Sequence, residues 1–72
     1  MTEIKYHVQE GQELEYGTPY YWKDITVYDE SNPGDLEAPL ESALAHLEWL
    51  PRSFPGRYFR ILQTVETVIA SA

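Results

Sequence analysis

The sequence predicts an α+β fold, a two-layer sandwich in which one helix covers one face of an antiparallel-rich sheet of three to four strands. Three observations support this fold class. Residues 35–50 are the only segment with helical periodicity. The remaining apolar segments are rich in β-branched and aromatic residues, as strands are. The resulting order, β-(β)-β-α-β, fits one helix packed on one sheet, and 72 residues make a single domain, 1–72.

The first strand is predicted at Glu3–Gln9, where apolar and polar residues alternate. Glu10 and Gly11 interrupt that alternation. Gln12–Tyr16 is then either a short returning strand or part of a longer loop. Gly17 and Pro19 mark the next turn.

Tyr20–Asp29 is the strongest strand, because it is dense in aromatic and β-branched residues. Strict alternation places one set of its side chains toward the helix and core: Tyr21, Ile25 and Val27. The same alternation places another set on the opposite face: Tyr20, Trp22 and Tyr28. Residues 30–34 have turn chemistry throughout.

The helix is predicted over 35–50 from one apolar stripe: Leu36, Leu40, Ala43, Leu44, Leu47 and Leu50. Asp35 is a candidate N-cap, although Pro39 is tolerated only in a first turn and moves the regular helix toward Ala38. Pro51 is expected to end the helix. We expect Leu40, Leu44 and Leu47 to form the core with the sheet.

The last strand is predicted over 57–71, where repeated β-branched residues argue against a helix. Alternation places Ile61 and Val65 on one side and Arg60 and Glu66 on the other. A chain of this length buries only about 60% of its unfolded surface. It contains no cysteine, so no disulfide adds stability. A homodimer or a partner protein is the remaining way to bury more apolar surface.

The formal charge of −7 is unevenly distributed. Residues 1–50 contain eleven acidic and two basic side chains, a net −9, whereas residues 51–72 carry three arginines and one glutamate, a net +2. Such a surface repels phosphate, which excludes direct nucleic-acid binding and anionic membranes and favours a partner protein with a basic surface. Solubility alone is the alternative explanation. The candidate acidic binding residues are Glu10, Glu13, Glu15, Asp29, Glu30, Asp35, Glu37 and Glu41.

The inventory of catalytic and metal-ligating residues is small. His7 and His46 belong to different elements and share no metal-ligand spacing with other residues. The segment from Asp29 to Leu40 resembles a calcium loop in part, but it has Pro33 at the fifth position and Leu40 at the twelfth, where a bidentate glutamate belongs. We therefore expect a protein that is not an enzyme, with no catalytic residues, no metal and no cofactor.

The aromatic residues are candidate anchors for a protein partner: Tyr20, Trp22, Tyr28 and Trp49. The first three also fit a cross-strand ladder that merely stabilises the sheet, or a face through which a homo-oligomeric accessory module pairs with itself. Trp49 fits either a binding hot spot at the end of a small-residue groove or a structural role over Pro51 and the connector 52–55. We favour the structural role for Trp49.

No apolar run approaches the roughly 20 residues that a membrane span requires, and residues 1–11 lack the features of a signal peptide. These features predict a cytoplasmic protein.

In size, acidity, lack of cysteine and order of elements, the chain resembles the small proteins that phages and mobile elements encode to disable host machinery, anti-CRISPR proteins among them. The stretches that carry this resemblance are YYWKDITVYD, LESALAHLEWL and RYFRILQTVETVIA. The resemblance implies an inhibitor in the host cytosol whose acidic residues occupy the phosphate-binding surface of a nucleic-acid-handling complex. It assigns no role to an individual residue.

Overall fold

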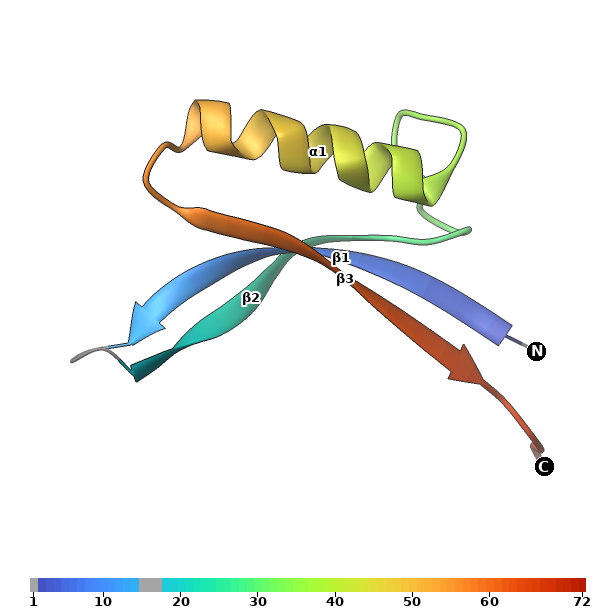
Figure 1. Ribbon diagram of the computed structural model, residues 1–72. Helices are drawn as coiled ribbons and strands as arrows, with labels where there is room; N and C mark the ends of the chain where they lie inside the picture. Colours follow the sequence, from blue (N-terminus) through green and yellow to red (C-terminus); the bar gives the residue numbers. More distant parts are fainter. Residues whose placement is uncertain (1, 15–17) are drawn as a thin grey trace.

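Three strands and one helix follow one another in the order β-β-α-β (Figure 1). The computed structural model describes residues 2–14 and 18–72, with the backbone alone at 13, 14 and 18–20. The elements are β1 (Thr2–Leu14), β2 (Thr18–Tyr28), α1 (Pro39–Ser53) and β3 (Tyr58–Thr67). The sheet has the order β2-β1-β3, and both strand pairs are antiparallel.

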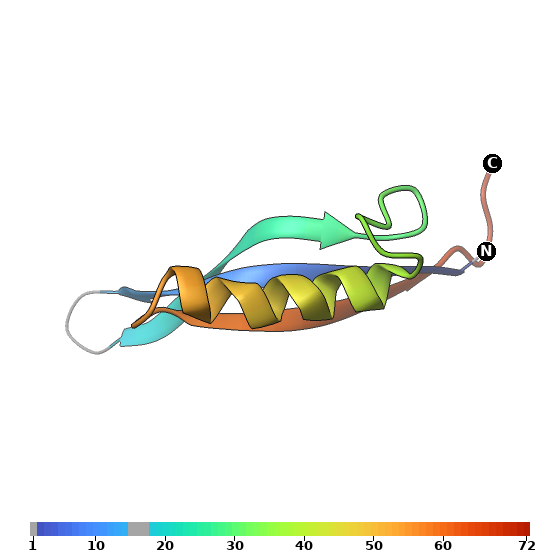
Figure 2. The same ribbon diagram turned by 90° about the horizontal axis from the view of Figure 1, so that it is seen from above.

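The helix packs on one face of the sheet, which confirms the predicted two-layer α+β sandwich. Seen from above, α1 lies over β1 and β3, and the end of β2 runs to one side of it (Figure 2). The opposite face of the sheet has no second layer among the described elements. Since β1 is central, β2 and β3 are the two edges of the sheet.

The first strand is longer than predicted, because Glu10 and Gly11 do not interrupt it. Gly11 pairs with Trp22 on one side and with Tyr58 on the other. A Cβ atom on Gly11 would lie 3.1 Å from the Trp22 ring and 3.3 Å from the Tyr58 Cβ. This glycine is therefore the site where an indole crosses the central strand closely, and it ends no strand. Of the predicted return segment, Tyr16 lies outside the described residues.

A β-bulge in β2 changes which of its side chains face the helix. Val8 pairs with Thr26 and Gln9 pairs with Asp24, so Ile25 is an extra residue without a partner on β1. Alternation therefore reverses at Ile25. Tyr28 and Thr26 lie on the helix side with Val8, whereas Asp24 and Trp22 lie on the open side with Gln9.

Strict alternation consequently places three residues on the wrong face. Tyr28 packs against the core under the helix, although alternation with Trp22 places it on the open face. Val27 pairs with His7, whose side chain points to the open face, and Ile25 is 42% exposed at the bulge. Alternation predicts that Ile25 and Val27 belong to the helix-covered core, and neither of them does.

The ends of α1 also differ from the prediction. Ala38 is the N-cap residue and no side chain caps the helix, so Asp35 does not have the capping role. Pro39 occupies the first turn, as expected. Pro51 lies inside the helix instead of ending it. One turn beyond it, the Phe54 N–H donates to the Leu50 carbonyl at 2.8 Å, so the last turn closes despite the donor missing at proline.

Ser42 connects the helix to the loop that precedes it. Its hydroxyl donates to the Pro33 carbonyl and accepts a hydrogen bond of 3.2 Å from the Leu36 N–H. The side chain is buried, which a polar group tolerates when it is hydrogen-bonded. This contact turns the Ser42 side of α1 toward the loop and β2.

The rotation of α1 makes the core smaller than the leucine stripe predicts. Fully buried apolar residues are Val8, Ala43 and Leu50, and half-buried apolar residues around them are Tyr6, Tyr28, Phe59 and Ile61. Leu40 is 41% exposed and Leu44 is 51% exposed, so the expectation that they anchor the core is wrong. Leu47 is half-buried.

Candidate functional site

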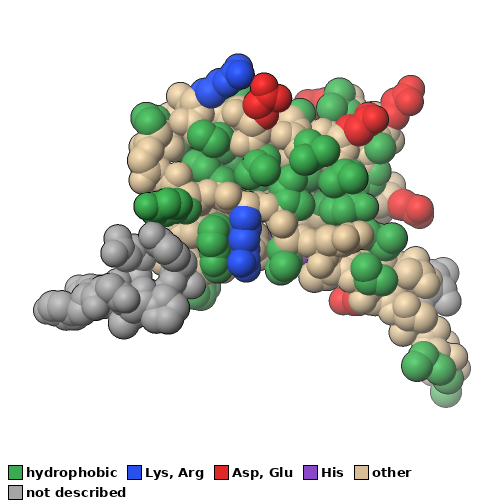
Figure 3. Space-filling model, in the orientation of Figure 1, with side chains coloured by type: hydrophobic (Ala, Val, Ile, Leu, Met, Phe, Trp, Pro, Cys, Tyr) green, Lys and Arg blue, Asp and Glu red, His purple; other side chains and the backbone are tan. Residues whose placement is uncertain are grey.

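Six carboxylates gather at one end of the molecule, where β1 begins and the loop 29–38 leads into α1 (Figure 3). We call this surface the acidic end, and its residues are Glu3, Asp29, Glu30, Asp35, Glu37 and Glu41. Five of them belong to the predicted acidic set. All except the half-buried Asp29 are exposed. The acidic end thus combines one carboxylate from β1 with five from the loop and the start of the helix.

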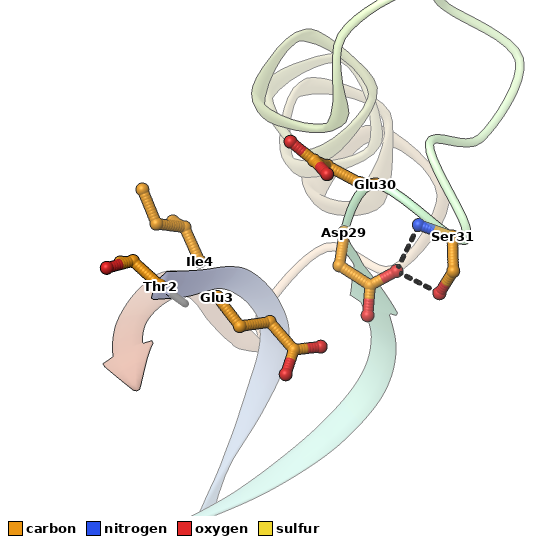
Figure 4. A pocket seen from close by; sticks show the side chains of 6 residues that line it. All are labelled: Thr2, Glu3, Ile4, Asp29, Glu30 and Ser31. Carbon is orange, nitrogen blue, oxygen red and sulfur yellow. Dashed lines mark hydrogen bonds between the residues drawn. The ribbon is translucent and has the colours of Figure 1, made fainter. Parts of the chain in front are cut away.

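A hollow of about 430 Å³ opens at the acidic end between the first residues of β1 and the turn after β2. Its lining includes Glu3, Asp29 and Glu30 together with the aliphatic side chain of Ile4 (Figure 4). Glu3 comes from β1 and Asp29 directly follows β2, and Glu30 extends from the turn toward the helix side (Figure 4). Carboxylates beside an aliphatic wall suit a basic side chain, whose stem is apolar and whose head is charged.

Asp29 has a structural role within this hollow. Its Oδ1 accepts hydrogen bonds from the Ser31 N–H at 3.0 Å, the Ser31 hydroxyl at 2.7 Å and the Asn32 N–H at 2.9 Å. The Ser31 hydroxyl is the main reason that the pKa of Asp29 lies below its ordinary value. Asp29 therefore holds the turn and keeps its negative charge to lower pH than a free aspartate does.

Of the other predicted acidic residues, only Glu10 has a described side chain. Glu10 accepts a 3.0 Å hydrogen bond from Arg57, which neutralises it at the opposite end of the sheet. Glu13 is in β1, but its side chain is not described, and Glu15 lies outside the described residues. Glu10 is therefore not part of the acidic end.

The three aromatic candidates whose side chains are described do not form one surface. Trp22 lies on the open face, with the Arg60 guanidinium 4.1 Å from its ring centroid. Tyr28 lies under the helix, where its hydroxyl is 3.1 Å from His46 Nδ1. Trp49 lies on α1 and is 54% exposed. The side chain of Tyr20 is outside the described part of the chain.

Trp49 contacts the connector after α1, as the favoured structural role predicts. Its ring meets the Phe54 ring edge to face, with 6.1 Å between centroids, and Arg57 lies over that same Phe54 ring at 5.3 Å. Trp49 also borders a hollow of about 350 Å³ formed largely by Tyr28, Leu36, Ser42, Ala45 and His46. This hollow between α1 and the loop contains two of the small residues of the predicted groove, Ser42 and Ala45, but larger side chains form most of its lining.

The open face of the sheet carries a polar network that the sequence does not reveal. The His7 Nδ1–H donates to Asp24 Oδ2 at 3.1 Å, and His7 Nε2 lies 3.0 Å from the Thr64 hydroxyl. Gln9 Nε2 donates to Asp24 Oδ1 at 2.7 Å, and Arg60 Nε donates to Gln9 Oε1 at 2.8 Å. The hydrogen bond from Gln9 and then the one from His7 lower the pKa of Asp24.

Thr64, His7 and Asp24 have the connectivity of a hydroxyl–imidazole–carboxylate triad. Acyl transfer also needs backbone N–H donors aimed at an oxyanion and a concave site for substrate. The N–H groups of central β1 serve the sheet ladders on both sides, and neither hollow described above includes any of the three residues. The arrangement therefore fits a cross-strand network that fixes the register beside the bulge. Only the strand pairing brings these residues together, since they come from three separate strands.

The described part of the chain contains no group of three or more side chains placed to hold a metal ion. None of its helices combines the length and the apolar character that a membrane crossing needs. Comparisons with known protein families, with curated proteins and with solved structures find no match to this chain.

Proposed function

We propose that the protein is a non-catalytic inhibitor that binds a basic surface of a nucleic-acid-handling protein complex through its acidic end. It acts in the cytosol of a host cell, as the small phage-encoded proteins that it resembles do. Its carboxylates occupy positions that nucleic-acid phosphates otherwise take, so the complex loses access to its substrate. The protein itself contacts no nucleic acid, because its charge has the same sign as phosphate.

The concentration of unneutralised carboxylates at the acidic end is the observation that supports this proposal. The ion pairs among the described residues include Glu3 with Lys5 at 3.7 Å but no partner for Glu30, Asp35, Glu37 or Glu41. Like charges close together raise the free energy of the folded state. Binding a cationic partner lowers this free energy, because the partner neutralises the repelling charges.

The hollow beside Ile4 gives the acidic end a place for a specific contact. An arginine or lysine from the partner would lay its aliphatic stem against Ile4 and its charged head among Glu3, Asp29 and Glu30. Because Asp29 is already held by Ser31 and Asn32, this part of the site needs little reorganisation on binding. The carboxylates of the loop and helix then supply the longer-range field.

The test compares two charge reversals that change the net charge equally. Glu37→Lys reverses a charge at the acidic end. Glu48→Lys reverses the charge of an exposed glutamate on α1 that pairs with Arg52. A partner is first captured from host lysate with the wild-type protein and identified, and association rates are then measured over a range of salt concentrations. We expect Glu37→Lys to slow association several-fold at low salt and to flatten the salt dependence.

Glu48→Lys should associate nearly as fast as wild type. Equal effects of the two reversals would mean that only the total charge matters. No effect of either would mean that the carboxylates serve solubility, and both results would overturn the proposal. Circular dichroism of each variant verifies that the fold is retained.

The alternative of self-pairing through an aromatic sheet face loses support from the side-chain positions. Tyr28 lies under the helix and the Trp22 ring is stacked with Arg60, so the described residues offer no continuous aromatic face.

A further inference from the structure

A row of leucines on α1 lies beside the edge strand β3, with Leu40 and Leu44 exposed and Leu47 half-buried. His46 marks the side of α1 that faces β2, since it contacts Tyr28. At about 100° per residue, Leu40, Leu44 and Leu47 lie roughly 100–160° around the axis from His46, on the side of β3. Space-filling Figure 3 shows apolar side chains gathered over α1 and β3, where β3 is the near edge of the sheet in Figures 1 and 2.

β3 itself presents an unpaired edge below this row. Its ten residues pair with β1 on one side only, so alternate backbone N–H and C=O groups on the other side lack a strand partner. Among the described elements, none lies beyond β3. The edge and the leucine row together form one surface with both hydrogen-bonding and apolar character. We call it the β3 surface, and it consists of Leu40, Leu44, Leu47, Ile61 and Val65 with the backbone of β3.

We propose that the β3 surface binds a second copy of this chain. The two β3 strands pair antiparallel about a two-fold axis at Gln63 and form one six-stranded sheet with both helices on the same face. This proposal is independent of the proposed function, because no residue of the acidic end belongs to the β3 surface. The proposed dimer differs from one that pairs through the open sheet face, because edge-to-edge pairing leaves that face exposed.

The sequence of β3 is self-complementary in this register. Pairing about Gln63 places Ile61 opposite Val65 of the partner subunit, so apolar residues meet on the helix side. It also places Arg60 opposite Glu66 of the partner subunit on the open side, so opposite charges meet twice across the interface. A shift by one residue would put helix-side residues opposite open-side residues, which a continuous sheet does not allow.

The charges of one protomer favour this arrangement. Within the chain, Glu66 pairs in the sheet with Glu3, a like charge directly opposite it. An arginine on the other side of Glu66, Arg60 of the partner subunit, therefore offsets this repulsion. Antiparallel pairing also places the two acidic ends on opposite sides of the two-fold axis.

The leucine row fits the same two-fold axis. The helix rises about 1.5 Å per residue and a strand about 3.3 Å, so counting back from the connector places Leu44 above about residue 62 of β3. Leu44 then meets Leu44 of the partner subunit near the axis, and Leu40 faces Leu47 of the partner subunit. The stripe thus becomes buried between two helices instead of between a helix and its own sheet.

The experiment is sedimentation equilibrium of the full chain over a range of concentrations. We expect wild type to dimerise, and Leu44→Glu to raise the dimer dissociation constant at least about 30-fold, because both leucines of the central contact are replaced by like charges. Ala45→Glu is the matched control: it adds the same charge at the next exposed position, on the side away from β3. It should leave the dissociation constant within about threefold of wild type.

A second pair of variants tests the register. Glu66→Lys puts like charges opposite each other twice and should weaken the dimer about 5- to 20-fold. Glu3→Lys changes the other member of the same glutamate pair but lies on the central strand, away from the interface, so it should weaken the dimer much less than Glu66→Lys. Circular dichroism establishes that each variant is folded.

A monomeric wild type would overturn the proposal and would leave a strand from a different protein as the occupant of this edge. A dimer that survives Leu44→Glu but dissociates with Trp22→Ala would also overturn it, in favour of the open face. Equal effects of Glu66→Lys and Glu3→Lys would refute the register.

Discussion

Replacing Gly34 by alanine tests how tightly the loop 29–38 is packed against the helix. Gly34 has a φ of +77°, a conformation that costs an L-residue about 1–2 kcal/mol. An added Cβ would lie 2.7 Å from both the Ser42 hydroxyl and a Tyr28 ring carbon. Ser42 is held by Pro33 and Leu36, and Tyr28 by His46, so neither neighbour can move without losing a hydrogen bond.

Overpacking of this kind adds about 1–3 kcal/mol. We therefore expect Gly34→Ala to lower the free energy of unfolding by about 2–5 kcal/mol. A chain of 72 residues is stable by only about 4–11 kcal/mol in total, so the loss is large. Urea denaturation, followed by far-ultraviolet circular dichroism at one fixed protein concentration, measures it.

Gly56→Ala is the matched control for the steric part. Gly56 has a φ of +85°, but an added Cβ would meet nothing within 4 Å. This variant should cost only the conformational part, about 1–2 kcal/mol. If both variants destabilised the protein equally, the close contact of Gly34 with Ser42 and Tyr28 would be wrong, and with it the position of the loop.

Three further predictions concern the core, the helix–strand contact and the polar network. Leu50→Ala should lower the free energy of unfolding by about 2–5 kcal/mol in urea denaturation, because Leu50 is only 3% exposed. Leu40→Ala should lower it by less than about 1 kcal/mol in the monomer. The reverse order would contradict the observed rotation of α1. Tyr28→Phe should cost about 1 kcal/mol by removing the hydrogen bond to His46, and no change would mean that this bond does not form in solution. The pKa of Asp24 is lowered by Gln9 and His7, so its contribution to stability is present above about pH 4 and is lost as pH falls through the lowered folded pKa. Asp24→Asn should therefore flatten the acid side of a pH–stability profile, and an unchanged slope would show that the network does not contribute.

The sequence by itself determined the fold class, because periodicity of 3.6 in one segment and β-branched content in the others depend only on local residues. It also placed five carboxylates around the turn and the start of the helix, where the structure finds the acidic end. Alternation correctly assigned the faces of β3, which has no register shift against β1.

Only the tertiary structure decided which faces of β2 and α1 are buried. Ile25 is ordinary as a strand residue, yet the bulge there reverses the pattern and moves Tyr28 under the helix. In the same way, the hydrogen bonds of Ser42 to the loop rotate the helix and expose Leu40 and Leu44. The bulge depends on the pairing of β1 with β2, and the exposure of the leucines accompanies contacts between α1 and the loop before it. Local periodicity carries no information about either contact.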